Sequence, residues 1–381
     1  MDFSWSEEQQ ALRRSVIQFA QNELVSDLIE EDRKQEFSWD GWRQCARFGI
    51  QGLLAPEEFG GGGADLLTTV VALEALGYGC RNNGLIFSIN AHLWGCTTPL
   101  LDFGTEAQKR KYLAKLARGE WVGAKAFAEA GAAQGCANTN GGGFSRMRAR
   151  AEHKEGRWVL NGSKVSVSNA PLADLLIVYA HVDAAASADR EGGPGVTAFL
   201  VEKDAPGLSA SPPVERMGLR TSPAGDLSLV NCEVPEENVL GGIGGGAAIL
   251  EASTEVERIG LMAGELGMMQ RQLETSTHYA AERKQFGQPI GKFPAVAAKL
   301  ANMDVRLETS RLVLYKAAWL KQQGKNPQRE IGIARAYVPD AAIQTCRDAV
   351  QIHGGYGYMT EYQIERELRD AVSEKIHGMS D

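Results

Sequence analysis

The stretch "QIHGGYGYMTEY", residues 351–362, places three glycines between two segments that have helical patterns. A glycine inside such a pattern costs about 1 kcal/mol relative to alanine, because its backbone has more freedom to lose on folding. The pair Gly354-Gly355 therefore indicates a helix end where another molecule approaches a bare backbone. The alternative is a plain turn between helices, in which Tyr356 and Tyr358 serve only as packing.

A second stretch, "ERKQFGQPIG" at residues 282–291, ends a long helical pattern. Arg283 is suited to bind a phosphate through two parallel hydrogen bonds, and the ring of Phe286 is suited to cover a flat heterocycle. The alternative is a capped helix end in which Gly287 breaks the helix, Pro289 prevents its continuation and Phe286 belongs to the core.

Composition narrows the class of protein. The chain has 381 residues, of which 44% are apolar and 23% charged, as in a soluble globular protein of two or three packed units. Its net charge of -8 argues against nucleic-acid binding. We find no apolar run long enough to span a membrane and no signal-peptide pattern, and the six cysteines are scattered without metal-ligand spacing. These features predict a cytoplasmic protein with reduced thiols and no metal.

The order of patterns along the chain predicts an α+β fold. Residues 1–122 are mostly helical, and the first helix follows Ser6 as its cap. Short β-type runs separated by turn residues occupy residues 123–235 and predict an antiparallel sandwich or barrel. Helical spacing returns after "GGIGGG" and marks helices near residues 256–273, 294–323 and 331–352.

The absence of several motifs argues against common enzyme classes. No GxGxxG motif follows a strand, and no Walker loop or GxSxG element is present.

The run "KRKYLAKLAR" is basic, and it is either a solvated helix face or a docking patch for an acidic partner. The charged residues that would matter for docking are Lys109, Arg110, Lys111 and Lys115.

Together, the two glycine stretches resemble those of the acyl-CoA dehydrogenase superfamily of flavoproteins. "PEEFGGGG", "NGSKVSVSNAPLAD" and "GLRTSPAGDLSLVNCEVPEENVLG" are also similar and occur in the family's order. The resemblance covers nearly the whole chain and implies an N-terminal helical domain (1–122), a middle antiparallel β domain (123–235) and a C-terminal four-helix bundle (236–381). It also implies FAD as the cofactor.

The resemblance accounts for the glycines of the first stretch. In this family, both C-terminal stretches contact the adenine and pyrophosphate end of an FAD that a neighbouring subunit binds, and a bare backbone lets the cofactor approach. A shared site implies a homodimer or homotetramer. The residues that the resemblance assigns to this end of FAD are Arg283, Gln285, Phe286, Gln351, Gly354 and Gly355.

The family's reaction needs a base, because the proton α to a thioester carbonyl is removed while a hydride goes to flavin N5. Many members carry a glutamate near the C-terminus, where this chain has His377 or Gly378 and where Glu374 comes too early. A subset that includes isovaleryl-type enzymes uses a Glu-Arg dipeptide near the start of the helix after the β domain. Here that dipeptide is Glu257-Arg258, so we expect Glu257 as the base and Arg258 beside the substrate. The alternative is that Glu257 is an ordinary helix-start acid favoured by the helix dipole.

The flavin and substrate pocket departs from the family pattern. Ala128 stands where a threonine usually binds the flavin, and Ser166 replaces an aromatic residue that covers it, whereas Ser168 keeps a hydroxyl. Gln134 and Gly135 replace a Ser-Asp pair whose serine holds the pantetheine end of the substrate. The resemblance thus implies a flavin pocket retained in outline, with altered handling of CoA esters.

"SNAPLADLLIVYA" and "ERIGLMAGELGMMQRQLE" are most similar to dehydrogenases that act on carrier-bound acyl groups in secondary metabolism, such as prolyl-carrier-protein dehydrogenases. The resemblance implies α,β-dehydrogenation of an acyl or aminoacyl thioester and favours a carrier protein over CoA. Electrons would pass to a flavoprotein or to oxygen, and an acidic carrier would suit the basic cluster. The alternatives are a flavin monooxygenase or oxidase on the same fold, or a catalytically silent FAD-binding subunit.

Overall fold

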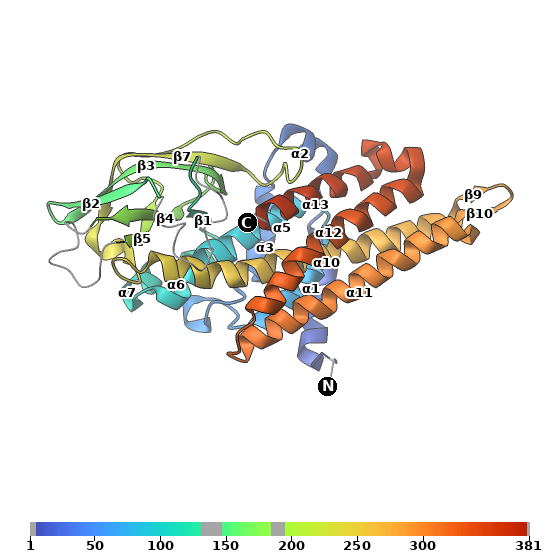
Figure 1. The fold of residues 1–381 in the computed structure, drawn as a ribbon, viewed down its shortest axis with the longest axis horizontal. Helices are drawn as coiled ribbons and strands as arrows, with labels where there is room; N and C mark the ends of the chain where they lie inside the picture. The colour runs from blue at the N-terminus through green and yellow to red at the C-terminus, as the bar shows by residue number, and fades with distance from the viewer. Residues whose placement is uncertain (1–4, 131–146, 184–194, 379–381) are drawn as a thin grey trace.

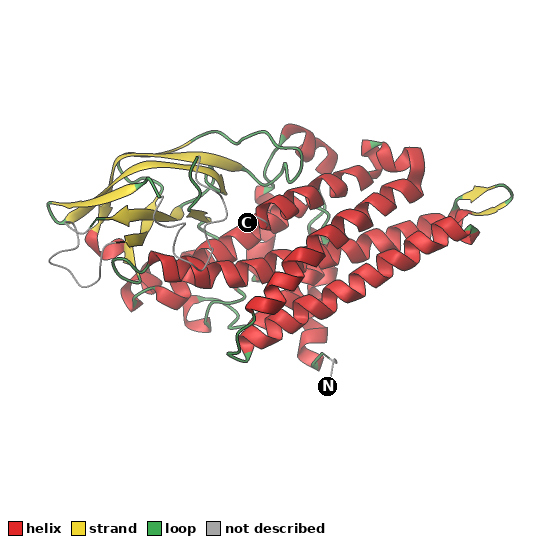
Figure 2. Cartoon of the chain, viewed as in Figure 1, coloured by secondary structure: helices red, strands yellow, loops and turns green. Residues whose placement is uncertain are grey.

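The computed structural model describes residues 5–130, 147–183 and 195–378. A helical region is followed by a β domain and then by a second helical region (Figures 1 and 2). This order confirms the predicted α+β class. The β domain lies at one end of the molecule, and the longest helices extend away from it toward a small hairpin at the other end.

The N-terminal region is built from short helices, several of which are completely buried. Ser6 caps the first of them as predicted, and its hydroxyl accepts a hydrogen bond from the backbone N–H of Gln9 at 3.1 Å. The helices are α1 (Glu7–Glu23), α2 (Leu28–Lys34), α3 (Trp39–Phe48), α4 (Leu66–Gly79), α5 (Asn83–His92), α6 (Thr98–Phe103), α7 (Glu106–Gln108) and α8 (Ala114–Ala117), with the π-helical turns η3 (Leu93–Thr97) and η4 (Lys109–Leu113).

The β domain forms one sheet, in the order β6-β7-β3-β2-β4-β5-β8, with β1 also paired to β4. Most neighbours are antiparallel as predicted, but β1 and β2 both run parallel to β4. Parallel neighbours need a long connection, which the chain between these strands provides. The strands are β1 (Gly123–Ala126), β2 (Arg150–Lys154), β3 (Arg157–Ser168), β4 (Leu175–Val182), β5 (Gly195–Glu202), β6 (Leu208–Ala210), β7 (Ala224–Pro235) and β8 (Val239–Leu240).

Four long helices make the C-terminal region, and a two-stranded hairpin joins the first two (Figure 1). Short 3-10 turns, η8 (Gly354–Tyr358) and η9 (Thr360–Tyr362), lie between the last two helices. The helices are α10 (Gly246–Glu282), α11 (Pro294–Gln322), α12 (Gln328–His353) and α13 (Ile364–Gly378), and the hairpin strands are β9 (Lys284–Gln285) and β10 (Gln288–Pro289).

Helix α10 connects the two ends of the molecule. Its 37 residues span about 55 Å at 1.5 Å per residue. The first turns pack on the β domain, where Ile249 and Leu250 share a core cluster with Leu175. Farther along, α10 packs closely on α4, and a Cβ added to Gly77 would lie 2.3 Å from the carbonyl oxygen of Gly264.

Two expected absences can be checked only on the part of the chain that the structure describes. Within it, no helix has the length and apolarity needed to cross a membrane. The same residues contain no cluster of side chains able to hold a metal ion. Five of the six cysteines are buried and unpaired, and Cys136 lies outside the described residues.

Candidate functional site

Strand β1 presents alternate residues to two different surroundings. Ala124 and Ala126 are buried in the core of the β sheet, so Lys125 points to the opposite face. Gly95 of η3 lets β1 approach closely, because a Cβ there would lie 3.1 Å from the Cβ of Lys125. The strand therefore delivers one charged side chain to the junction between the β domain and the helices.

Glu257 meets that side chain from α10. Its carboxylate forms an ion pair with Lys125 Nζ, and the two side chains are only 11% and 17% exposed. Tyr179 of β4 is buried nearby, and burial, with a smaller effect of the Glu257 charge, raises the pKa of its hydroxyl. The predicted base thus lies in an enclosed, charged junction. Sequence reasoning missed Lys125, although a lysine inside the otherwise apolar run "GAKAFA" was a signal for it.

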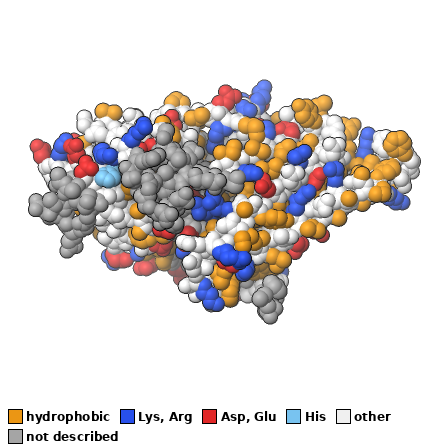
Figure 3. All heavy atoms as spheres, in the orientation of Figure 1, with side chains coloured by type: hydrophobic (Ala, Val, Ile, Leu, Met, Phe, Trp, Pro, Cys, Tyr) orange, Lys and Arg blue, Asp and Glu red, His pale blue; other side chains and the backbone are white. Residues whose placement is uncertain are grey.

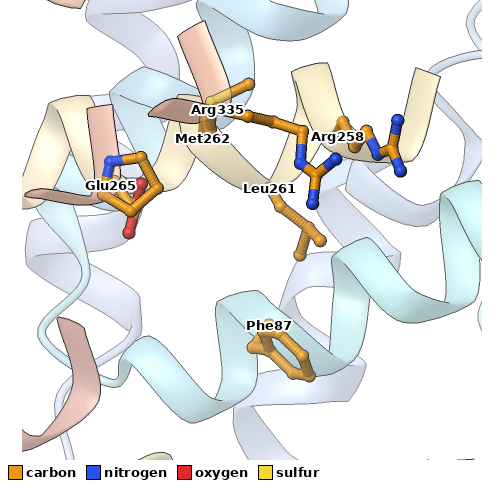
Figure 4. Close-up of a pocket in the computed structure, with 7 residues that line it drawn as sticks. Phe87, Arg258, Leu261, Met262, Glu265 and Arg335 are labelled. Atoms are coloured by element: carbon orange, nitrogen blue, oxygen red, sulfur yellow. The ribbon is translucent and has the colours of Figure 1, made fainter. Parts of the chain in front are cut away.

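Arg258 faces a different side of α10. Successive helix residues are rotated by about 100°, so Arg258 points away from β1 and toward a pocket of about 20 Å³, which has room for one water molecule (Figure 4). Burial lowers the pKa of the Arg258 guanidinium, and the charge of Arg335 adds to the effect. The substrate-binding role of Arg258 stays a prediction. The pocket is lined by Phe87, Arg258, Leu261, Met262, Glu265, Arg335 and Pro339.

The three residues predicted to surround the flavin lie on adjoining segments. Ala128 follows β1, and its carbonyl oxygen accepts a hydrogen bond from the N–H of Val165 on β3 at 2.9 Å. Ser166 is exposed with a positive φ of 52°, and its N–H donates to Asp226 Oδ1 at 2.8 Å. Ser168 is half-buried on the same strand. The structure therefore brings these positions together, while Gln134 lies outside the described residues.

A buried ion pair supports the same edge of the sheet. Lys164 Nζ lies 2.7 Å from Glu129 Oε1, and Glu129 also accepts hydrogen bonds from the backbone N–H groups of Arg148 and Ala149. Burial opposes ionisation of Glu129, but Lys164 and the backbone donors outweigh it and lower the pKa of the carboxyl. The pair ties Glu129 to the start of the segment that leads into β2. Sequence reasoning missed it too, although Lys164 falls on the buried face of an alternating strand.

The glycine stretch that opened the sequence analysis lies at the far end of the molecule. Arg283, Gln285, Gly354 and Gly355 line a groove of about 790 Å³, a size typical of ligand sites. A Cβ added to Gly354 or Gly355 would meet nothing within 4 Å, so this backbone is open to a ligand. The Arg283 guanidinium lies 5.7 Å from the ring centre of Tyr356.

Phe286 projects from the molecule at the tip of the β9–β10 hairpin, with 93% of its surface exposed. Phe286 and Gly287 have φ values of 49° and 79°, as in a two-residue type I′ turn. The alternative that Phe286 is a core residue is therefore wrong. Tyr356 and Tyr358 are also exposed, and Gln351 is exposed in the last turn of α12. Figure 3 shows apolar side chains gathered on this end of the molecule.

Two further predictions concern the C-terminus and the basic cluster. His377 lies in the last turn of α13, but its side chain is outside the described residues, as is that of Glu374. In the basic cluster, Lys111 Nζ lies 2.9 Å from Glu202 Oε1, whereas Arg110 is exposed. Part of the positive charge is thus neutralised within the chain.

The residues present fit FAD at two separate places. At the β domain, Ala128 follows the strand whose Lys125 forms an ion pair with the buried Glu257, and the far groove offers Arg283 and a bare glycine backbone. Glu257 and the end of α10 are 25 residues apart, or about 38 Å along the helix. The two groups of predicted FAD residues therefore lie at opposite ends of one chain.

Comparison with known proteins agrees with this architecture. Models of the acyl-CoA dehydrogenase N-terminal, middle and C-terminal domains match residues 6–120, 126–232 and 244–378. An L-prolyl-[peptidyl-carrier protein] dehydrogenase from Pseudomonas fluorescens is 36% identical over 100% of this chain and 97% of its own. The crystal structure of the prolyl acyl carrier protein oxidase AnaB superposes with a TM-score of 0.91 at 45% identity, covering 98% of this chain and 96% of AnaB. The structure of PigA with FAD and proline gives 0.91 at 33% identity over 99% and 95% of the two chains. The chain belongs to the acyl-CoA dehydrogenase family, as its two C-terminal glycine stretches predicted.

Proposed function

We propose that this protein is an FAD-dependent enzyme that oxidises the α,β carbon–carbon bond of an aminoacyl thioester held by a carrier protein. The observation that carries this proposal is the position of Glu257, a carboxylate enclosed where α10 meets β1 of the β domain. The relatives support the substrate class, since one is named for a prolyl-peptidyl-carrier protein and another for a prolyl acyl carrier protein.

In this proposal, Glu257 accepts the proton from the carbon next to the thioester carbonyl. When bound, FAD supplies the acceptor for the hydride that leaves the neighbouring carbon. The substrate thereby loses one proton and one hydride, and a double bond forms between the two carbons. Because the Glu257 side chain is only 11% exposed, its carboxylate has limited contact with water.

Two groups of residues would hold FAD. Ala128, Ser166 and Ser168 would lie beside the flavin of the chain's own cofactor. Because the second group lies beyond the end of α10, about 38 Å along the helix from Glu257, it would hold the adenine and pyrophosphate end of a cofactor belonging to another copy of the chain. That group comprises Arg283, Gln285, Phe286, Gln351, Gly354 and Gly355.

This arrangement implies a homodimer or homotetramer, and the surface of α11 supports it. Val305, Leu312 and Trp319 are 61%, 56% and 44% exposed and recur every seven residues, so they form one apolar stripe on the helix. Together with the exposed Phe286, this stripe is suited to pack against a second copy of the chain.

Carrier recognition is proposed at two places. Gln134 and Arg258 would lie near the pantetheine arm and the acyl group, as the family pattern implies. Acidic carriers would approach the cluster at residues 109–115, where the exposed Arg110 presents positive charge.

The test is an anaerobic flavin titration. The purified protein is expected to show a flavin spectrum, and a prolyl thioester on a carrier protein is expected to bleach it, whereas the same acyl group on CoA is expected to react more slowly. The unloaded carrier and free proline serve as controls. A colourless protein that takes up no FAD, or a flavin that no thioester bleaches, would overturn the proposal and leave a scaffold subunit.

The oxidase alternative has one specific observation in its favour, because the relative AnaB is named an oxidase. Reduced enzyme is therefore mixed with oxygen or with an electron-transferring flavoprotein. Fast reoxidation by oxygen with release of the desaturated product identifies an oxidase, and a hydroxylated product identifies a monooxygenase. Fast transfer to the flavoprotein alone identifies a dehydrogenase.

A further inference from the structure

We propose that Lys125 is a positioning residue for Glu257, holding the carboxylate ionised and aimed from β1 so that it is ready to accept a proton. The inference rests on the proposed function, in which Glu257 is the base. It starts from the direct ion pair between Lys125 Nζ and Glu257 Oε2 at the junction of β1 and α10.

The strand that carries Lys125 is held on several sides. The backbone N–H of Gly123 donates to His92 Nδ1 at 2.9 Å, and that of Val122 donates to Asp174 Oδ2 at the same distance. Gly95 packs against the Cβ of Lys125, so the lysine stem has little room to move sideways. A short, anchored strand therefore determines where the ammonium group can lie.

The alternation of β1 explains why a lysine here reaches α10. Ala124 and Ala126 fill the core of the sheet, and a one-residue shift would bury the ammonium among them. On the opposite face, the partly buried Phe127 packs with its ring centre 6.0 Å from that of Tyr179. Lys125 lies on this same face, between the β domain and the helices.

Charged and titratable groups from other elements surround the ion pair that Lys125 forms with Glu257. Titratable groups around the pair include Tyr179 on β4 and Cys96 on η3, both buried, and burial raises the pKa of each. On α10 itself, Arg258 turns toward the pocket with Arg335. Glu255 adds a negative charge, but its carboxylate lies 2.6 Å from Lys321 Nζ.

A base accepts a proton only when it is ionised, and an opposite charge within about 4–6 Å favours the ionised carboxylate. Lys125 thus extends the activity of Glu257 toward lower pH and keeps the carboxylate in one orientation. Without the cation, the same carboxylate in this enclosed junction would hold its proton to higher pH.

The test is the pH profile of kcat/KM for anaerobic flavin reduction. The acid limb is the part of this profile in which kcat/KM falls as the pH is lowered. In Lys125→Met, the acid limb is expected to move to higher pH by about 1–3 units, and kcat/KM is expected to recover at pH values above it. Lys125→Arg keeps the charge and is expected to keep the limb near its wild-type position. Lys154→Met, which removes the exposed ion-pair partner of Glu152 on β2, is the matched control. An unmoved limb in a folded Lys125→Met protein would overturn the inference.

Thermal unfolding separates this inference from the proposed function. Lys125→Met is expected to lower Tm because it leaves a buried carboxylate without its cation, and adding Glu257→Gln is expected to restore part of the loss. If the change in Tm of the double variant equals the sum of the changes in the two single variants, the ion pair is contradicted, independently of any measurement of activity. If the Tm values are coupled but no thioester bleaches the wild-type flavin, the proposed function fails while the ion pair stands.

Discussion

The two ends of α10 lie in contrasting surroundings. At its start, Glu257 and Lys125 are enclosed by the helices and the sheet. At its end, Phe286 is 93% exposed, and the backbone of Gly354 and Gly355 faces open space. Helix α10 therefore links a buried region near the β domain to an exposed region at the far end of the molecule (Figure 1).

In the proposed function, this difference joins cofactor binding to assembly. Burial supplies the electrostatic control that proton transfer needs, and a single chain can provide it. A large exposed ring and a bare backbone are costly in isolation and become useful only when a ligand or another chain covers them. The predictions below test each end separately, in order of expected effect.

The largest effect is expected at the enclosed end. Glu257→Gln keeps the shape of the side chain but removes the base, so anaerobic bleaching by the carrier-bound thioester should slow by about 10³-fold or more. Glu251→Gln, an exposed position on the same helix, should leave the rate unchanged. Bleaching that survives in Glu257→Gln would move the base toward His377.

The enclosed end should also respond to pH through His92. Burial lowers the pKa of this imidazole to about 4, whereas an unfolded histidine titrates near 6.5. Between these values the unfolded state binds the extra proton, so stability is complete above pH 6.5 and falls as the pH drops toward 4. The loss in the free energy of unfolding should reach about 3 kcal/mol, as measured by denaturant titration.

The control for this prediction is the exposed His278. His92→Gln should flatten the pH dependence between pH 6.5 and 4 even if it lowers stability overall, and His278→Gln should not. An unchanged slope in His92→Gln would show that other groups govern acid stability.

At the open end, a side chain on the bare backbone should weaken cofactor binding. Gly355 lacks a positive φ, so Gly355→Leu adds bulk without backbone strain. FAD affinity, measured from cofactor retained after dialysis, should fall about tenfold. This estimate follows from the loss of roughly 1.4 kcal/mol of contact. Gly332→Leu, at a glycine of α12 that also has open space around it, is the control. Equal retention in both variants would remove the far groove from the FAD site.

The smallest effect is expected at the basic cluster of residues 109–115. Arg110→Glu should raise KM for the carrier-bound thioester by a few fold, because an exposed charge mainly affects the rate of encounter. KM for a CoA thioester should not change, and Arg47→Glu on α3 should alter neither. Equal effects on both substrates would show that the patch acts through the fold and not through docking.

Much of this molecule follows from local patterns. Ser6 caps α1, and the spacing of apolar residues at 256–273 lies within α10, because caps and helical periodicity act over a few residues. The two C-terminal stretches likewise identified the family, because the glycines and Arg283 that mark it lie within short stretches of sequence. Local patterns left Phe286 open between a core residue and a ring that covers a ligand, and its exposed place at the turn tip excludes the core.

The sequence by itself determined the α+β order and the family, because each depends on neighbours along the chain, and it predicted which residues would contact FAD. Tertiary structure alone decided that Lys125 meets Glu257, which is 132 residues away, and that Arg258 turns from it. It also decided that the predicted FAD residues form two distant groups. Such relations depend on how strands and helices pack across the whole chain, and no local spacing encodes which distant charge a buried carboxylate will meet.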